Sequence, residues 1–406
     1  MAILDPLCTV RPDPALAAKI SVPPYDVVSS AEARVLSRAH PDSFFRVSRP
    51  EVGLPEGTDE HSDAAYAKGR EALVDLLGRG VLRRDSTPRY LVYRQTWQGR
   101  TQTGVVAGAS VAAFADGRIK KHELTRADKE DDRTRHVDVL GGNDEPVFFA
   151  FRARADVAAV LQRVQTQAPE VDFTSDDGVG HTLWPLSSDD TRALGQALGA
   201  LEVLYIADGH HRSAAASRVN RLRVQRGAKG THDRMLAVAF PHDQLRILPY
   251  NRLVKDLGRY TPATFLQALG QHFTVSPGTP TPRRRHTFSL YLSRTWHQLE
   301  AKSGSFPETP TGSLDVAILQ QNVLQALLGI GDPRTDQRID FVGGIRGTAE
   351  LEKRVDAGGW AAAISMFPTS LEELFAVADA GEIMPPKSTW FEPKLRSGLF
   401  LHLFEP

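Results

Sequence analysis

Apolar residues recur along this chain in two patterns. In some segments they are three or four residues apart, as in helices, and in others they alternate with polar residues or form short runs, as in strands. Residues 63–79 place apolar side chains at helical spacing and end at glycine, which predicts a surface helix. Residues 89–97 and 103–114 read as two strands joined by the turn "QGRTQ". The next predicted elements are helices near 156–167 and 189–201, a strand at 203–207, a helix from about 213 to 226 and a strand at 234–240. This alternation predicts an α/β fold, a mixed α+β core.

A segment of different composition, "SPGTPTPRRRH" at residues 276–286, interrupts these patterns. It is rich in Pro, Thr and Arg, as exposed loops and hinges are. Strands and helices alternate again after it, up to the tail "MPPKSTWFEPKLRSGLFLHLF". A chain of 406 residues exceeds the size that one core usually organises. We therefore expect an N-terminal region of residues 1–275 and a C-terminal region of residues 276–406.

Composition restricts the partners of this chain. Lys plus Arg (49) equals Asp plus Glu (49), so no overall field attracts nucleic acid or an anionic membrane, and any anion must be bound by a local arrangement. The single cysteine, Cys8, excludes an internal disulfide and a cysteine-based zinc cluster, and favours a reducing compartment. The first residues do not resemble a secretory signal, and no apolar run approaches about 18 residues. We expect a cytoplasmic protein with no nucleic-acid or membrane partner.

The segment "IADGHHR" carries the most specific candidate chemistry. A predicted strand leads into Asp208, a permissive Gly209 and an Ala-rich helix, so backbone N–H groups at a helix N-terminus offer an anion site. His210, His211 and Arg212 add side-chain donors to it. Arginine binds a phosphate through two bonds, and histidine donates or transfers a proton near neutral pH. The alternative is a helix cap with solvated histidines behind it; the combination of these residues favours the phosphate site.

The segment "KKHELTRADKEDDR" is the most charged stretch of the chain, and we expect it to lie across a sheet edge or cleft. His122 and Glu123 follow a strand-like stretch, where a cleft can hold them, and we interpret them as catalytic residues. Many charged residues in such runs only face solvent. The others are weaker candidates: Glu130, Asp131 and Asp132 as bases or Mg²⁺ ligands, and Lys129 and Arg133 as phosphate partners. No histidine follows at the spacing of an H-E-x-x-H zinc helix.

Three further segments add less specific candidates. "MPPKST" has the Lys-Ser-Thr order of a P-loop but lacks its glycines, so we reject a Walker site and keep Lys387 as a cation that can reach a phosphate. "PPYD" and "LPYNR" share an aromatic and polar pattern beside prolines. We expect Tyr25, Asp26, Asn251 and Arg252 to line one cleft and bind substrate.

Motifs of two common enzyme classes are absent from the sequence. There is no G-x-S-x-G nucleophile elbow, and Cys8 has no visible catalytic partner. No G-x-G-x-x-G follows a strand, which argues against a dinucleotide site. The glycines of "VLGGNDEP" and "VGGIRG" are interpreted as turns.

Five separated segments together resemble a known family. "PPYDVV", "KKHELTRADKEDDR", "IADGHHR", "LPYNRLVKDL" and "MPPKSTWFEPKLRSGL", in this order over nearly the whole chain, resemble the prokaryotic family catalogued as domain of unknown function 1015. The "DGHHR" core is also similar to the phosphate-binding motif of the ParB and sulfiredoxin-like superfamily, which includes free serine kinases. The resemblance implies a ParB/sulfiredoxin-like phosphate-binding core with additional α/β elements.

The same resemblance implies roles for individual residues. The Gly209 to Arg212 segment would hold nucleotide phosphates, and the upstream Glu123 would be the general base for the attacking hydroxyl. Asp208 would orient a histidine or bind the metal.

These features lead to one main hypothesis, a Mg²⁺-dependent kinase that uses ATP or ADP to phosphorylate serine or a similar hydroxy amino acid. Phosphoryl transfer requires that phosphate charge is neutralised, a metal placed and a hydroxyl oriented. Two alternatives use the same phosphate site: a phosphatase acting on a small ester such as phosphoserine, and a nucleotide-binding switch whose output is a partner. A homo-oligomer is compatible with the sequence.

Overall fold

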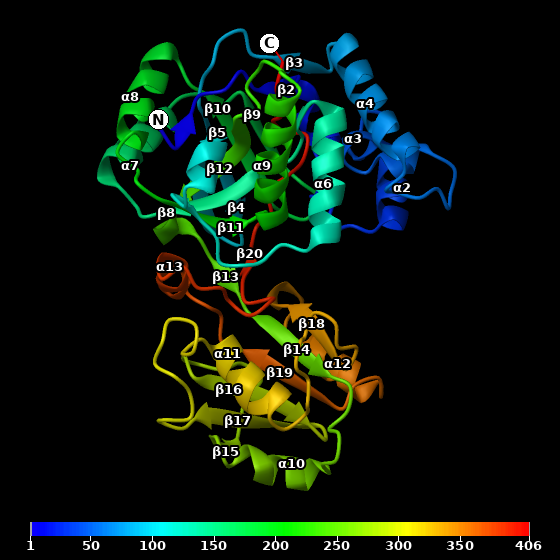
Figure 1. Ribbon diagram of the computed structural model, residues 1–406, viewed down its shortest axis with the longest axis vertical. Helices are drawn as coiled ribbons and strands as arrows, with labels where there is room; N and C mark the ends of the chain where they lie inside the picture. The colour runs from blue at the N-terminus through cyan, green and yellow to red at the C-terminus, as the bar shows by residue number, and fades with distance from the viewer. Residues whose placement is uncertain (1, 406) are drawn as a thin grey trace. The chain divides into compact units, whose positions relative to one another are not determined.

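The computed structural model describes residues 2–405 and has a mixed α/β fold, as predicted (Figure 1). The chain forms two compact units: unit 1 comprises Met1–Leu245 and Pro393–Pro406, and unit 2 comprises Arg246–Glu392. The predicted boundary after residue 275 does not coincide with this division. The Pro-, Thr- and Arg-rich segment after it connects two strands of one sheet in unit 2, β15 (Phe273–Pro277) and β16 (Thr287–Leu292). A change of composition therefore marked a loop within a unit.

Unit 1 is organised around a nine-stranded sheet with the order β6-β11-β8-β12-β5-β4-β10-β9, with β1 paired to β5. The β11–β6 and β12–β8 pairs are parallel and the other pairs antiparallel. The strands are β1 (Leu4–Asp5), β4 (Leu91–Trp97), β5 (Arg100–Ser110), β6 (Ile119–Lys120), β8 (Val147–Phe151), β9 (Val171–Thr174), β10 (Gly180–Pro185), β11 (Leu204–Asp208) and β12 (Arg234–Pro241).

The main core of unit 1 lies between this sheet and two amphipathic helices, α7 (Ala155–Val164) and α8 (Ser188–Leu198). Alternate residues of β5, namely Val105, Ala107 and Ala109, belong to this core, as the two-residue period of a strand requires. Two other helices, α6 (Ala127–Leu140) and α9 (His210–Gln225), pack side by side (Figure 1). The short helix α5 (Val111–Ala115) follows β5 directly, so the end of the predicted strand 103–114 is helical.

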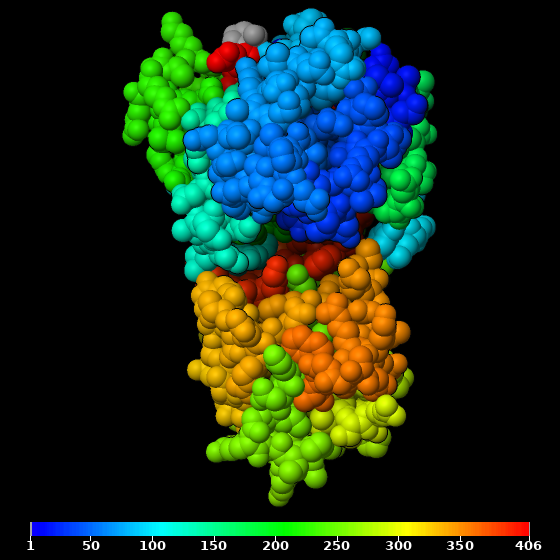
Figure 2. All heavy atoms as spheres, turned by 90° about the vertical axis from the view of Figure 1, so that its right-hand side faces the viewer, coloured from blue at the N-terminus to red at the C-terminus, as the bar shows by residue number. Residues whose placement is uncertain are grey.

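The N-terminal residues and the C-terminal tail form a second layer of unit 1. Its core contains apolar side chains of α2 (Ser30–Ala39), α3 (Phe45–Ser48) and α4 (Asp63–Gly78), together with Leu401 of the tail. Figure 2 shows the face that these N-terminal residues present, in blue. The remaining elements are α1 (Ala17–Ile20) and the small pairs β2 (Val10–Pro12) with β3 (Leu82–Arg84) and β7 (Gly142–Asn143) with β21 (His402–Leu403). The tail is thereby fixed beside residues from the first half of the chain.

Unit 2 contains a six-stranded antiparallel sheet with the order β15-β17-β16-β19-β14-β18. Its other strands are β14 (Tyr250–Val254), β17 (Thr295–Ala301), β18 (Ile339–Gly343) and β19 (Ala362–Met366), with the pair β13 (Ile247–Leu248) and β20 (Trp390–Phe391) apart from it. Its helices are α10 (Pro262–Leu269), α11 (Asp315–Leu319), α12 (Ala349–Asp356) and α13 (Leu371–Asp379), and a π-helical turn, Gln320–Gln325, continues α11. Ser370 caps α13 through a capping box with Glu373.

Candidate functional site

The "DGHHR" segment forms a tight junction between β11 and α9 at the edge of the unit 1 sheet. Asp208 ends the strand, and His210 begins the helix, three residues earlier than predicted. Gly209 between them has φ 99°, in the left-handed region that glycine adopts without strain. The first turn of a helix leaves its leading amides without intrahelical acceptors, and here they belong to His210, His211 and Arg212. The junction has the geometry of an anion site at a helix N-terminus.

A cluster of charges surrounds Asp208 at this junction. Its Oδ2 accepts a bond from Arg212 at 3.2 Å and lies 3.5 Å from Nζ of Lys394, which is in the C-terminal tail. Burial alone would raise the pKa of Asp208, but the charges of Lys394 and Arg212 outweigh it and the pKa is lowered. Arg212 also donates to the carbonyl of Pro146. A carboxylate and two cations are therefore held beside the free amides of α9.

His122, Glu123 and His210 approach one another at the same junction. One donor atom of each residue lies within 4.8 Å of the others. The rings of His122 and His210 meet edge to face, with centroids 4.5 Å apart, and the His122 amide lies 3.4 Å from Nε2 of His210. Burial lowers the pKa of His122 to about 4 and the pKa of His210 well below its ordinary value. Both rings are neutral at pH 7, and the structure brings together the two segments that the sequence singled out.

The segment between β6 and α6 also contacts His211, the second residue of α9. The amide of Arg126, immediately before α6, donates to Nε2 of His211 at 3.0 Å. Burial lowers the pKa of His211, against the opposing charges of Asp26 and Glu130. Because His211 accepts this bond through Nε2, its other ring nitrogen carries the proton in the neutral form.

Tyr25 and Arg133 lie against each other in the same unit. The Arg133 guanidinium stacks over the Tyr25 ring at 4.1 Å. The Tyr25 amide donates to Oε1 of Glu145 at 3.0 Å, and the Ser397 hydroxyl donates to the same oxygen at 2.7 Å. Asp26 is exposed beside this group, and its charge contributes to raising the pKa of Glu145. The predicted residues Tyr25, Asp26 and Arg133 are thus linked to the junction through Glu145.

Glu145 and Lys394 are site residues that the sequence analysis missed. Glu145 is 5% exposed, and its Oε2 has no hydrogen-bond partner among the described residues. Burial raises the pKa of Glu145, and the charge of Asp144 adds to this. A cavity of about 10 Å³ is lined by Arg133, Arg212 and the carboxylates of Asp144 and Glu145. It has room for roughly one water molecule. The signal was present in "NDEP", where two acidic residues precede a strand, but we interpreted that segment as a turn.

All five of the weaker acidic and basic candidates lie on α6. Asp132 accepts bonds from Tyr66 at 2.7 Å and Arg133 at 2.8 Å, and lies 2.8 Å from His61, so its oxygens are engaged within unit 1. Glu130 and Asp131 both contact Arg218 of α9. Lys129 lies in the first turn of α6, where its charge contributes to lowering the pKa of Asp128.

The remaining predicted residues, Asn251, Arg252 and Lys387, belong to unit 2. Asn251 accepts a bond from the Met366 amide at 3.0 Å, and Arg252 donates to the carbonyls of Tyr250 and Lys387. The Lys387 ammonium lies 5.5 Å from the Tyr250 ring. These contacts hold β14 and the segment before β20 together. The expectation that Asn251 and Arg252 share a cleft with Tyr25 and Asp26 remains a prediction.

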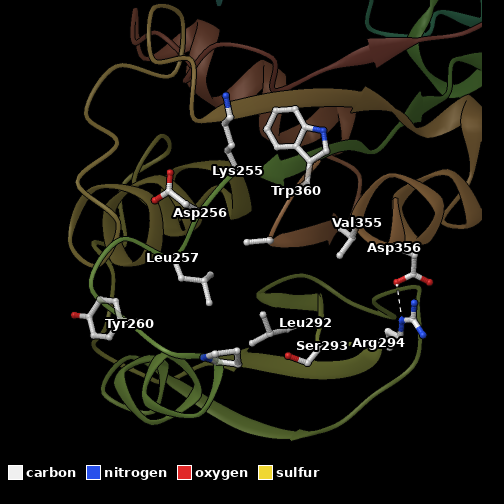
Figure 3. A pocket seen from close by; sticks show the side chains of 12 residues that line it. Lys255, Asp256, Leu257, Tyr260, Leu292, Ser293, Arg294, Val355, Asp356 and Trp360 are labelled. Atoms are coloured by element: carbon white, nitrogen blue, oxygen red, sulfur yellow. Dashed lines mark ion pairs between the residues drawn. The ribbon is translucent and has the colours of Figure 1, made fainter. Parts of the chain in front are cut away.

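Unit 2 also has a surface hollow of about 480 Å³ at one end of its sheet. Figure 3 shows Trp360, Leu257 and Leu292 beside it, and Arg294 turned toward Asp356 at 3.7 Å. None of the residues predicted for the site lines this hollow.

Comparison with solved structures finds distant similarity. A free serine kinase in complex with AMP aligns over 71% of this chain and 86% of its own, with 14% identity and a TM-score of 0.36. SbnI with a C-terminal truncation, from Staphylococcus aureus, aligns over 72% of this chain and 85% of its own, with 10% identity and a TM-score of 0.38. A conserved hypothetical protein from Pyrococcus furiosus aligns over 71% and 90%, with 14% identity and a TM-score of 0.34.

The sequence matches no curated protein. Among residues 2–405, no helix combines the length and apolar character that crossing a bilayer requires. The model of the family described as "Protein of unknown function (DUF1015)" matches residues 4–317, which is most of the chain. The order of motifs indicated this membership, and the match confirms it: the chain belongs to the DUF1015 family of proteins of unknown function.

Proposed function

We propose that this chain is a small-molecule phosphotransferase, a Mg²⁺-dependent kinase that transfers phosphate from ATP or ADP to free serine or a similar hydroxy amino acid. The observation that carries the proposal is the β11–α9 junction, where Arg212 lies beside the leading amides of α9. Amides at a helix N-terminus and a guanidinium fork are donors that suit a phosphate. They also supply the local positive charge that a chain of zero net charge requires.

Most of the predicted site residues have a role in this proposal. Gly209 lets the backbone approach the phosphate, while His210, His211 and Arg212 bind it. Glu123 accepts the proton of the attacking hydroxyl, and His122 positions the group around it. The remaining cations, Lys129, Arg133 and Lys387, are proposed to bind phosphate, and Tyr25, Asp26, Asn251 and Arg252 to bind the substrate.

Asp208 is the carboxylate that fits a Mg²⁺ ion arriving with the nucleotide. Mg²⁺ takes oxygen ligands and is usually bound by one or two carboxylates together with phosphate oxygens. The lowered pKa keeps Asp208 ionised at neutral pH, and Arg212 and Lys394 both contact the same oxygen, Oδ2. When bound, the metal would neutralise phosphate charge during the transfer.

Isothermal titration of ATP and ADP in the presence of Mg²⁺ tests the proposal. We expect binding that weakens about ten- to a hundredfold in Arg212→Ala, because a hydrogen bond to a charged group contributes about 1.5–3 kcal/mol. Arg226→Ala is the matched control, since Arg226 follows α9 at its far end and pairs with Asp138. Absence of nucleotide binding, or equal affinity in Arg212→Ala, would contradict the proposal.

A product assay separates the kinase from the phosphatase alternative. The kinase requires nucleotide and forms a phosphorylated hydroxy amino acid from serine. Release of inorganic phosphate from phosphoserine without any nucleotide would support the phosphatase instead.

A further inference from the structure

We propose that His122, Glu123 and His210 form a binding site for a divalent ion that accepts nitrogen ligands, such as Zn²⁺ or Co²⁺. The ligands come from two separate segments of unit 1, the connection between β6 and α6 and the first residue of α9. The site is therefore not of the H-E-x-x-H type that the sequence excluded. Two imidazoles with one carboxylate are a ligand set that transition metals and zinc prefer over magnesium.

The distances among the three side chains suit such an ion. Ligands about 2.1 Å from a tetrahedral ion lie about 3.4 Å from one another. The donor atoms of this cluster lie within 4.8 Å of one another, so small side-chain rotations bring them to an ion. Glu123 lies in a bend of the chain. In a straight strand the side chains of His122 and Glu123 would point to opposite faces, whereas a bend allows both to face the same ion.

The setting of the His122 ring also agrees with metal binding. His122 has a hydrogen bond to the backbone of Ile206, which holds its ring in place. Histidine ligands in metal sites are commonly oriented by such a bond to a carbonyl. The charge of Asp208 acts on both rings and favours a nearby cation.

Three protein ligands leave at least one position of the ion for water or another oxygen. His210 is also the first residue of α9, so an ion bound there would lie near the start of the helix whose amides are proposed to bind phosphate. This metal site shares His122, Glu123 and His210 with the proposed kinase, and it goes beyond that proposal because its test involves no nucleotide.

Equilibrium dialysis of metal-free protein against Zn²⁺ or Co²⁺, followed by elemental analysis, tests the inference. We expect one ion per chain, and Co²⁺ should add visible absorption bands of a site with nitrogen ligands. His210→Ala and Glu123→Gln should each weaken metal binding by about tenfold or more. Loss of a residue that hydrogen-bonds to a metal ligand already costs about tenfold or more in affinity, and loss of the ligand itself should cost at least as much. His40→Ala is the control, because His40 is exposed and far along the chain from the cluster.

Glu123→Gln keeps the test decisive if a buried histidine variant fails to fold. Glu123 is partly exposed and lies outside regular secondary structure, so its amide variant should retain the wild-type circular dichroism. No binding to the wild-type protein, or equal binding in wild type and Glu123→Gln, would overturn the metal site. Arg212→Ala should lose nucleotide affinity and keep Co²⁺, so failure of the metal site and failure of the kinase proposal give different results.

Discussion

Replacing Gly209 by alanine tests whether the backbone of the β11–α9 junction builds the anion site. Gly209 has φ 99°, which a residue with a Cβ atom adopts only under strain. A Cβ added there would lie 3.0 Å from Nε and 3.2 Å from Cζ of Arg212. The substitution therefore strains the backbone and also displaces the guanidinium that bonds to Asp208.

The expected magnitude has two parts. A non-glycine residue in a sparsely populated backbone region costs about 1–3 kcal/mol of folding free energy. The Arg212 guanidinium must move by a few tenths of an ångström, which weakens its bond to Asp208 and shifts it relative to the amides of α9. We expect a stability loss in this range and a nucleotide affinity at least about tenfold lower, the loss of roughly one hydrogen bond to a charged group.

Gly227→Ala is the matched control for this substitution. Gly227 lies just beyond the other end of α9, also has positive φ, at 70°, and has open space where its Cβ would be. It should lower stability by about 1–2 kcal/mol through the backbone alone and leave nucleotide affinity unchanged. Urea unfolding followed by circular dichroism measures the first effect, and isothermal titration with ADP and Mg²⁺ the second. If both variants bind nucleotide with wild-type affinity, the geometry of Gly209 does not build the site and the reasoning fails.

Three other substitutions test separate parts of the structure. Lys394→Met removes one of the two cations beside Asp208 and should lower the free energy of unfolding by about 1–3 kcal/mol. Thermal unfolding at neutral pH measures this effect, and an unchanged melting temperature would show that the cation of the tail is not coupled to the junction. Burial raises the pKa of Asp315 in unit 2 to about 7, so the folded chain keeps a proton that the unfolded chain releases near pH 4, and stability should fall as pH rises from about 4 to 7. Asp315→Asn should reduce that slope in urea titrations, and an equal slope would refute the assignment. Phe149→Ala empties a fully buried position in the main core of unit 1 and should lower stability by about 3–5 kcal/mol in urea unfolding, whereas a loss below about 1 kcal/mol would contradict the core assignment.

Element type was largely predictable from the sequence because it depends on local periodicity and capping. The helix predicted at residues 63–79 is α4 (Asp63–Gly78), and the strand predicted at 234–240 is β12 (Arg234–Pro241). The predicted start of α9 was three residues late, since two histidines and an arginine were read as part of the turn. The turn "QGRTQ" is shorter than predicted, because Gln98 and Gly99 alone take positive φ and β5 begins at Arg100.

The candidate site was predictable only in part. The residues of "IADGHHR" predict their own local structure, which is the end of a strand, a glycine and the start of a helix. Its role in an anion site could therefore be argued from residues adjacent in sequence. For Glu145 the segment "NDEP" gave only a local signal, because its burial and its bonds to Tyr25 and Ser397 depend on residues that are 120 and 252 positions away. The same holds for Lys394, which reaches Asp208 across 186 positions.

The alternation of helices and strands, the family, and the segment proposed to bind an anion all follow from the amino-acid sequence. These properties depend on residue type and on spacing within a few residues. The contact between His122 and His210, the cation that the C-terminal tail supplies to Asp208 and the end of unit 1 became known from the folded structure. Such contacts depend on strand order and on the path of the chain between packed layers, which no short-range pattern encodes.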